Sequence, residues 1–285
     1  MYEQFYGLRE KPFALAPNPA YLYLTRHHQY ALTMLEYAIW QAAGFAVITG
    51  EVGCGKTTVL HHFLGDNRKQ LSVALLSHIH PGIGPLLPWV LDSLGVGSGE
   101  SPAHEAHRRL LAFLEQKHSA GERVLLVIDE AQNLSVGSLE ELRVLSNVNA
   151  GKHVLLQTIL VGQPELRTTL SLPGMRQFAQ RVVVDYHLTP LRCDETHAYV
   201  AHRLAVAGGS PDLISSDAVE LVHEYAGGVP RLVNILCDTA LVYGFAEQRP
   251  GIDVELVELV LADKAGGVLP IKTAPRAVAD SVVRG

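Results

Sequence analysis

A basic surplus, cysteine pairs and long apolar runs are all missing from this chain of 285 residues. The formal net charge is −6, so the composition gives no general sign of binding to nucleic acid or an anionic membrane, although the total would hide a local basic patch. The three cysteines (Cys54, Cys193 and Cys237) are far apart and form no C-x-x-C pair, which favours a reducing compartment.

Targeting and membrane-spanning patterns are missing as well. Residues 1–5 (MYEQF) lack the basic and apolar regions of a signal peptide. No apolar run approaches the roughly 18 residues that a membrane span requires. We therefore predict a cytoplasmic protein with no integral membrane segment, which would reach the inner membrane only through a partner.

Fourteen histidines raise the question of a metal site. His78 and His80 would share one face of a strand, and His104 and His107 one face of a helix. Because no cysteine or acidic residue joins either pair at ligand spacing, we predict no zinc site. There is also no hydrolase triad pattern and no internal repeat.

The sequence does contain a glycine-rich motif between an expected strand and an expected helix. Residues 50–57 (GEVGCGKT) match G-x-x-x-x-G-K-[ST] at every fixed position. Residues 45–49 are apolar and β-prone, and residues 57–64 have helical spacing, with Gly65 as the expected helix end. Strand, glycine-rich turn and helix are the arrangement in which backbone N–H groups and a helix N-terminus surround phosphate oxygens.

The residues of this motif have distinct expected roles in binding ATP and Mg²⁺. Lys56 is expected to reach the β- and γ-phosphates, and the Thr57 hydroxyl to ligate Mg²⁺. Cys54 occupies a variable position, where its thiol is either reactive, beside Lys56 and a helix N-terminus, or merely small. The predicted nucleotide-binding residues are Gly50, Glu51, Val52, Gly53, Cys54, Gly55, Lys56, Thr57 and Thr58.

Polar side chains follow two later apolar segments. Asp129 and Glu130 come directly after residues 124–128, and Gln163 follows residues 154–162. Open α/β sheets bind ligands at the carboxyl ends of their strands. We therefore expect Asp129 to hold Mg²⁺ and Glu130 to orient or polarise the attacking water. Gln163 either reaches the γ-phosphate or the water, or is only a turn residue before proline.

The chain divides by pattern into an α/β part and a helical part. Five β-prone apolar segments predict a parallel sheet: residues 45–49, 71–77, 124–128, 154–162 and 182–186. Beyond residues 189–191 only helices are expected, at 194–207, 217–226 with Ser216 as cap, 231–245 and 254–262. We predict an aromatic and proline-rich arm at 1–26, a nucleotide-binding domain at 27–190, a helical domain at 191–265 and a flexible tail at 266–285. The arm either walls the adenine pocket or only packs on the domain.

The order of these motifs resembles that of the AAA+ ATPases over about residues 1–265, and most closely the ExeA, or general secretion pathway protein A, group. The resemblance implies a three-layer αβα sandwich with a parallel five-stranded sheet, followed by a helical lid. Longer members continue into a membrane span and a peptidoglycan-binding domain, so we expect either a stand-alone member or a truncated chain. The resemblance rests on residues 5–13 (FYGLREKPF), 17–19 with His27, 129–132 (DEAQ), 160–166 (LVGQPEL) and 228–231 (GVPR).

The resemblance also implies roles for three polar residues. Gln163 matches sensor 1, and Arg231 matches sensor 2, which reaches the nucleotide from the lid. Arg181 fits the finger inserted into a neighbour's site better than Arg176, because Arg181 directly precedes the last strand, and both stay open. A cation at a helix start opposes the helix dipole, so Arg231 suggests an anionic partner; the alternative for Arg181 or Arg231 is a surface ion pair.

Together these features predict an Mg²⁺-dependent ATPase that forms a homo-oligomeric ring or filament, hexamer-like in the first case. It would drive or gate a protein partner in secretion or envelope assembly. An alternative is an ATP-gated assembly switch on DNA with slow hydrolysis, similar to the TniB-type transposition ATPases. A third hypothesis is a scaffold for envelope or polysaccharide export machinery.

Overall fold

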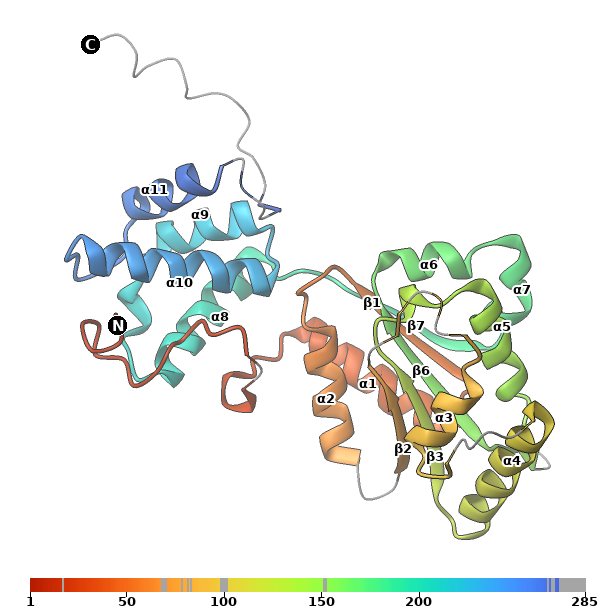
Figure 1. Ribbon diagram of the computed structural model, residues 1–285. Helices are drawn as coiled ribbons and strands as arrows, with labels where there is room; N and C mark the ends of the chain where they lie inside the picture. The colour runs from red at the N-terminus through yellow and green to blue at the C-terminus, as the bar shows by residue number, and fades with distance from the viewer. Residues whose placement is uncertain are drawn as a thin grey trace. The chain divides into compact units, whose positions relative to one another are not determined.

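The computed structural model describes residues 1–16, 18–67, 71–77, 79–80, 82, 84–97, 102–150, 153–265, 267 and 270–271. These residues form two compact units (Figure 1). One is an α/β unit, Arg26–Thr189, and the other is a helical unit that combines Met1–Thr25 with the residues from Pro190 onward. No helix in the described part of the chain is both long and apolar enough to cross a membrane.

A parallel five-stranded sheet organises the α/β unit, in the order β2-β3-β6-β1-β7. Strands β1 and β6 are buried at every position, and β3 is buried at every position after Arg123, as expected for the centre of a parallel sheet with two covered faces. The five predicted strands are thereby confirmed. Their bounds are β1 (Phe45–Gly50), β2 (Leu71–Leu76), β3 (Arg123–Ile128), β6 (Leu156–Gly162) and β7 (Val182–Leu188).

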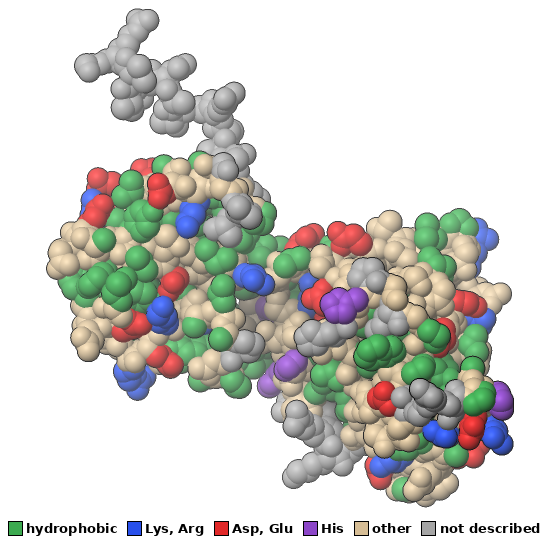
Figure 2. Space-filling model, viewed as in Figure 1, with side chains coloured by type: hydrophobic (Ala, Val, Ile, Leu, Met, Phe, Trp, Pro, Cys, Tyr) green, Lys and Arg blue, Asp and Glu red, His purple; other side chains and the backbone are tan. Residues whose placement is uncertain are grey.

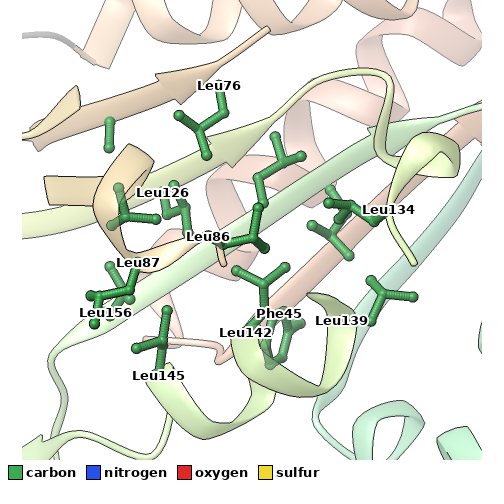
Figure 3. Close-up of a cluster of buried hydrophobic side chains, with 14 of the residues drawn as sticks. Phe45, Leu76, Leu86, Leu87, Leu126, Leu134, Leu139, Leu142, Leu145 and Leu156 are labelled. Carbon is green, nitrogen blue, oxygen red and sulfur yellow. The ribbon is translucent and has the colours of Figure 1, made fainter. Parts of the chain in front are cut away.

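Helices cover both faces of the sheet. Alternate strand residues, such as Phe45 and Leu126, point into one large apolar cluster with α3, α4 and α5 (Figure 3). The remaining strand residues, such as Ile48 and Leu125, are equally buried outside that cluster. The other face is therefore the one that α1 and α2 cover, and the unit has three layers. The helices are α1 (Arg26–Trp40), α2 (Lys56–Asn67), α3 (Leu87–Ser93), α4 (Ala103–Ser119), α5 (Val136–Leu145), α6 (Pro164–Leu170) and α7 (Arg176–Ala179).

Short elements complete the connections of this unit. A 3-10 turn, η2 (Ala131–Asn133), follows β3, and η3 (Pro173–Met175) precedes α7. The two-residue strands β4 (Asn149–Ala150) and β5 (His153–Val154) form a separate hairpin, so β6 begins later than the predicted segment 154–162. The expected helix end at Gly65 is wrong, because α2 continues through Asn67. A glycine weakens a helix but does not by itself end one.

The helical unit is built on a second apolar core. Its helices are α8 (Cys193–Val206), α9 (Ser216–Ala226), α10 (Pro230–Ala246) and α11 (Val254–Lys264), with 3-10 turns η1 (Pro19–Tyr21) and η4 (Pro211–Leu213). The cap of α9 is Ser215, whose hydroxyl accepts from the Ala218 N–H, and Ser216 is the first helical residue. The expected cap at Ser216 is therefore wrong by one position, since two adjacent serines offer the same capping chemistry.

The N-terminal arm is part of this helical core. Tyr2, Phe13 and Tyr21 are buried in the same cluster as residues of α8 to α11. Arg203 of α8 is also buried, and its guanidinium donates to the carbonyl oxygens of Pro12 and Ala14. A charged, planar donor group thus ties the arm backbone to α8.

Candidate active site

The glycine-rich segment 51–55 connects β1 to α2 at the carboxyl edge of the sheet. A Cβ atom on Gly50 would lie 2.6 Å from the Leu188 carbonyl oxygen, so β1 can end beside β7 only with glycine there. Gly55 has a φ of +93°, which L side chains rarely adopt. The fixed glycines of the motif therefore have structural reasons, and they turn the chain sharply into α2.

Lys56 begins α2 and its side chain folds back over the loop. The Lys56 Nζ donates to the carbonyl oxygens of Gly50, at 2.7 Å, and Glu51, at 2.9 Å. Burial lowers the pKa of Lys56, while Cys54 and the carboxylates of Glu130 and Asp129 act in the opposite direction. The Lys56 ammonium group is thus buried within the loop. Phosphate oxygens bound there would replace the two carbonyl oxygens as its hydrogen-bond acceptors.

Thr57 and Asp129 meet although they are 72 positions apart. The Thr57 Oγ1 donates to the Asp129 Oδ2 at 2.9 Å, and Asp129 is buried. The other carboxylate oxygen, Oδ1, accepts from the Glu130 N–H, while the Asp129 N–H donates to the Leu76 carbonyl at the end of β2. Hydroxyl and carboxylate oxygens are hard ligands of the kind that Mg²⁺ prefers, and this pair fits such an ion.

Glu130 follows in a left-handed backbone conformation with a φ of +56°. Such a conformation is costly for a residue with a side chain and is typical of functional sites. The Glu130 Oε2 accepts hydrogen bonds from the Nε2 atoms of Gln132 and Gln163, the latter at 3.4 Å. The structure therefore places Gln163, which directly follows β6, beside the acidic pair.

Two residues of this arrangement were not among the predicted site residues. Gln132 links Glu130 to the Gln163 backbone, and its sequence signal is its place in the segment 129–132 (DEAQ), in which it was assigned no role. His28 of α1 lies buried beneath the loop, where its Nε2 donates to the Cys54 carbonyl oxygen at 3.2 Å. The spacing of His28 with the buried Ala31 and Leu35 is the signal that could have placed it on the inner face of α1.

Cys54 is a buried part of the loop, with 1% of its surface exposed. Burial raises the pKa of its thiol to about 11, and the nearby Lys56 offsets only part of this effect. The thiol is therefore shielded and mainly protonated at neutral pH, which favours the small-residue interpretation over the reactive one.

Arg181 lies at the amino ends of the strands, opposite the end that carries the glycine-rich loop. It directly precedes β7, whose first residue pairs with Phe45 at the beginning of β1, whereas the loop follows the end of β1. The six residues of β1 separate these two ends of the sheet by roughly 20 Å. The Arg181 guanidinium donates to the Ser146 Oγ at 3.0 Å and to the Asn147 Oδ1. Arg181 is therefore not brought to the loop of its own chain.

Arg176 and Arg231 are exposed. Within the described part of the chain, neither guanidinium has a hydrogen bond or ion pair. Arg231 is the second residue of α10 in the helical unit, and residues 227–229 connect α9 to α10. No group of three or more metal-ligating His, Cys, Asp or Glu side chains occurs among the described residues, and His78 lies outside them.

Known proteins resemble this chain in sequence. Residues 39–170 match the family model of the AAA domain. General secretion pathway protein A of Aeromonas hydrophila is 40% identical over 251 residues, which cover 86% of this chain and 45% of that protein. The chain thus spans less than half the length of this relative.

Solved structures show the same fold at low sequence identity. The ORC2 protein of Aeropyrum pernix has a TM-score of 0.62 at 17% identity, over 89% of this chain and 71% of that one. Cdc6p of Pyrobaculum aerophilum has a TM-score of 0.59 at 16% identity, over 85% and 67%. The RuvB branch migration motor of Thermotoga maritima has a TM-score of 0.55 at 17% identity, over 84% and 69%. The five-stranded parallel sheet with its helices, followed by a helical lid, is the AAA+ fold; residues 39–170 match the AAA domain, and the chain is a homologue of general secretion pathway protein A.

Proposed function

We propose that this protein is an Mg²⁺-dependent ATPase that hydrolyses ATP to ADP and phosphate. The observation that carries the proposal is the contact of Thr57 with Asp129, next to Glu130 and beneath the glycine-rich loop. A loop alone supports nucleotide binding. A metal-binding pair beside a carboxylate at the same strand edge supports hydrolysis.

Each residue of the site has its own proposed role in phosphoryl transfer. The loop N–H groups and Lys56 would bind the β- and γ-phosphates and offset their charge. Thr57 and Asp129 would hold Mg²⁺, which supplies charge stabilisation when bound. Glu130 would accept a hydrogen bond from the attacking water and orient it, and Gln163 would donate to the water or the γ-phosphate.

The three arginines have proposed roles outside this set. Arg231, exposed at the start of α10, would bind the nucleotide phosphates from the lid and report the nucleotide state. Arg181 would insert into the site of a neighbouring copy, which suits a residue at the far edge of its own sheet. Its contacts with Ser146 and Asn147 also suit a purely internal role, whereas the exposed Arg176 has no such contacts. Both arginines stay candidates for the finger.

The assembly would be a homo-oligomeric ring or filament that acts on a protein partner in secretion or envelope assembly. The sequence likeness to general secretion pathway protein A supports this choice of partner. The DNA-switch alternative has less support, because acidic and basic side chains are interspersed on the face shown in Figure 2 and no basic stripe is visible there. A gel shift with ATP at low salt tests that alternative, and binding there would favour it.

The experiment for the ATPase proposal is the substitution Glu130→Gln. The variant is expected to keep its affinity for ATP and to lose turnover by roughly a hundredfold or more, since a positioned base contributes that much. Glu115→Gln on the exposed side of α4 is the matched control. A steady-state rate in Glu130→Gln equal to that of the wild type would overturn the assignment of Glu130.

The proposed finger is tested by mixing two inactive variants. Arg181→Ala keeps Glu130, and Glu130→Gln keeps Arg181, so mixed assemblies would contain complete sites and regain turnover. Asn147→Ala is the control for the internal contacts of Arg181. If Asn147→Ala loses as much turnover as Arg181→Ala and mixing restores none, Arg181 acts only inside its own chain, and Arg176→Ala is then tested in the same mixture.

A further inference from the structure

We infer that Gln132 is a positioning residue for the proposed hydrolysis, because its side-chain amide connects the Gln163 end of β6 to the carboxylate of Glu130. The inference rests on the proposed ATPase function and adds a residue that the motif analysis did not assign. It concerns one side chain, placed between the two groups expected to act on the attacking water.

The orientation of the Gln132 amide follows from its partners. The Gln163 backbone N–H can only donate, and it lies 3.0 Å from the Gln132 Oε1. The Gln132 Nε2 must then be the group that faces Glu130, where it donates to Oε2. A carboxylate can only accept, so both hydrogen bonds are satisfied in this orientation alone.

The surroundings leave room for this bridge and hold it in place. A Cβ atom on Gly162 would lie 3.0 Å from the Gln132 Oε1, so the last residue of β6 has no side chain where the amide passes. Gln132 itself lies in the turn η2, between the buried Ala131 and Asn133, whose Nδ2 donates to the Ile79 carbonyl. The turn is thus fixed on both sides of Gln132.

The consequence for Glu130 is an oriented carboxylate. Two amide donors hold Oε2, one from Gln132 and one from Gln163, while the other oxygen, Oε1, accepts no hydrogen bond within the described residues. One oxygen is therefore anchored, and the other would be left to accept from the attacking water of the proposed hydrolysis. Small displacements of a catalytic group cost large factors in rate, so an anchor at this position matters for turnover and little for ATP affinity.

Two substitutions separate the hydrogen bonds of Gln132 from its shape. Gln132→Met keeps the length of the side chain and removes both hydrogen bonds. Gln132→Glu keeps an acceptor for the Gln163 N–H but cannot donate to Glu130. Both are expected to lower kcat by roughly ten- to a hundredfold, with KM for ATP nearly unchanged. Gln116→Met, on the exposed side of α4, makes the matching substitution away from the site and is expected to stay near the wild-type kcat.

A double variant tests whether Gln132 acts through Glu130. In single-turnover experiments, adding Gln132→Met to Glu130→Gln is expected to cause no further loss, because the anchored carboxylate is already gone. If Gln132→Met lowers the single-turnover rate of Glu130→Gln by the same factor as it lowers that of the wild type, the inference is overturned. A wild-type kcat in Gln132→Met, or an equal loss in Gln116→Met, also overturns it.

Hydrogen exchange supplies a readout that needs no turnover. The Gln163 backbone N–H is expected to exchange faster in Gln132→Met and at the wild-type rate in Gln132→Glu, which retains the acceptor. Unchanged exchange in Gln132→Met overturns the bridge itself. If the wild type hydrolyses no ATP, the proposed function fails together with the kinetic role of Gln132, while the exchange result decides the bridge separately.

Discussion

The His28 imidazole fills the space into which a side chain on Gly55 would project. An ideal Cβ on Gly55 would lie 2.9 Å from the His28 Nε2, which also donates to the Cys54 carbonyl oxygen at 3.2 Å. Helix α1 thus supports the phosphate loop from below, through a contact that depends on the glycine. This relationship links a residue outside the motif to the shape of the loop.

Removal of the His28 side chain should weaken ATP binding without abolishing it. A net hydrogen bond contributes about 0.5–1.5 kcal/mol, so His28→Ala is expected to raise the Kd for ATP by roughly three- to tenfold. Isothermal titration calorimetry measures this change. His27→Ala is the matched control, since the neighbouring His27 contacts Tyr186 of β7 instead of the loop. An equal change in both variants would contradict a specific role of His28.

The contact between Thr57 and Asp129 predicts how Mg²⁺ should change ATP affinity. In the wild type, Mg²⁺ is expected to tighten binding, whereas Thr57→Val, which has the same shape without the hydroxyl, should lose most of this gain. Affinity measured in EDTA should be similar in the two proteins. Thr57→Ser restores the hydroxyl and should restore the response. A full Mg²⁺ response in Thr57→Val would remove Thr57 from the proposed metal site.

Local patterns predicted most of the α/β unit. The strand before the loop, the loop and the acidic pair at the end of β3 all follow from short runs of sequence, because a buried parallel strand is apolar throughout. The meeting of Thr57 with Asp129 could also be expected, since parallel strands bring their carboxyl ends to one edge.

Contacts across long separations were harder to predict. Nothing local shows that Gln132 bridges two strand ends or that His28 supports the loop, because each contact depends on how separate elements pack. Gly65 was expected to end α2, but a single glycine only weakens a helix, and α2 continues to Asn67. A motif also cannot reveal that Arg181 has partners in its own chain.

Burial predicts that Cys54 reacts slowly with alkylating agents. Its thiol pKa is raised to about 11 by burial, so little thiolate exists at pH 8. Cys193 is partly exposed and serves as an internal control. Mass spectrometry after brief iodoacetamide treatment should find Cys193 modified and Cys54 unmodified until denaturant is added. Rapid modification of Cys54 in the folded protein would show that the loop opens readily.

The same pKa predicts how stability changes at alkaline pH. The folded-state pKa lies above the unfolded value, so the unfolded thiol ionises first as the pH rises. The contribution of Cys54 is fully present below pH 9 and is lost as the pH rises to about 11. Chemical denaturation should therefore show a steeper alkaline loss in the wild type than in Cys54→Ala. Identical slopes in the two proteins would contradict the raised pKa.

Arg203 should hold the N-terminal arm on the helical unit. Its guanidinium donates to the Pro12 and Ala14 carbonyl oxygens and lies over the Tyr21 ring, at 4.9 Å from the centroid. Arg203→Ala removes all three contacts and leaves the carbonyl oxygen of the buried Pro12 without this donor, at a cost of about 1–3 kcal/mol for an unsatisfied buried group. We expect a lower Tm and rapid proteolysis within residues 1–25.

The control for this prediction is Arg192→Ala, next to the start of the same helix. Arg192 forms an exposed ion pair with Asp194, and such pairs contribute only about 0–1 kcal/mol. Its removal should leave the arm protected from protease. Arg203→Lys adds a second comparison, because an ammonium keeps the charge but cannot reproduce the planar fork that reaches two carbonyl groups. If Arg203→Lys protects the arm as well as the wild type does, charge alone holds it and the geometry of the guanidinium is not required.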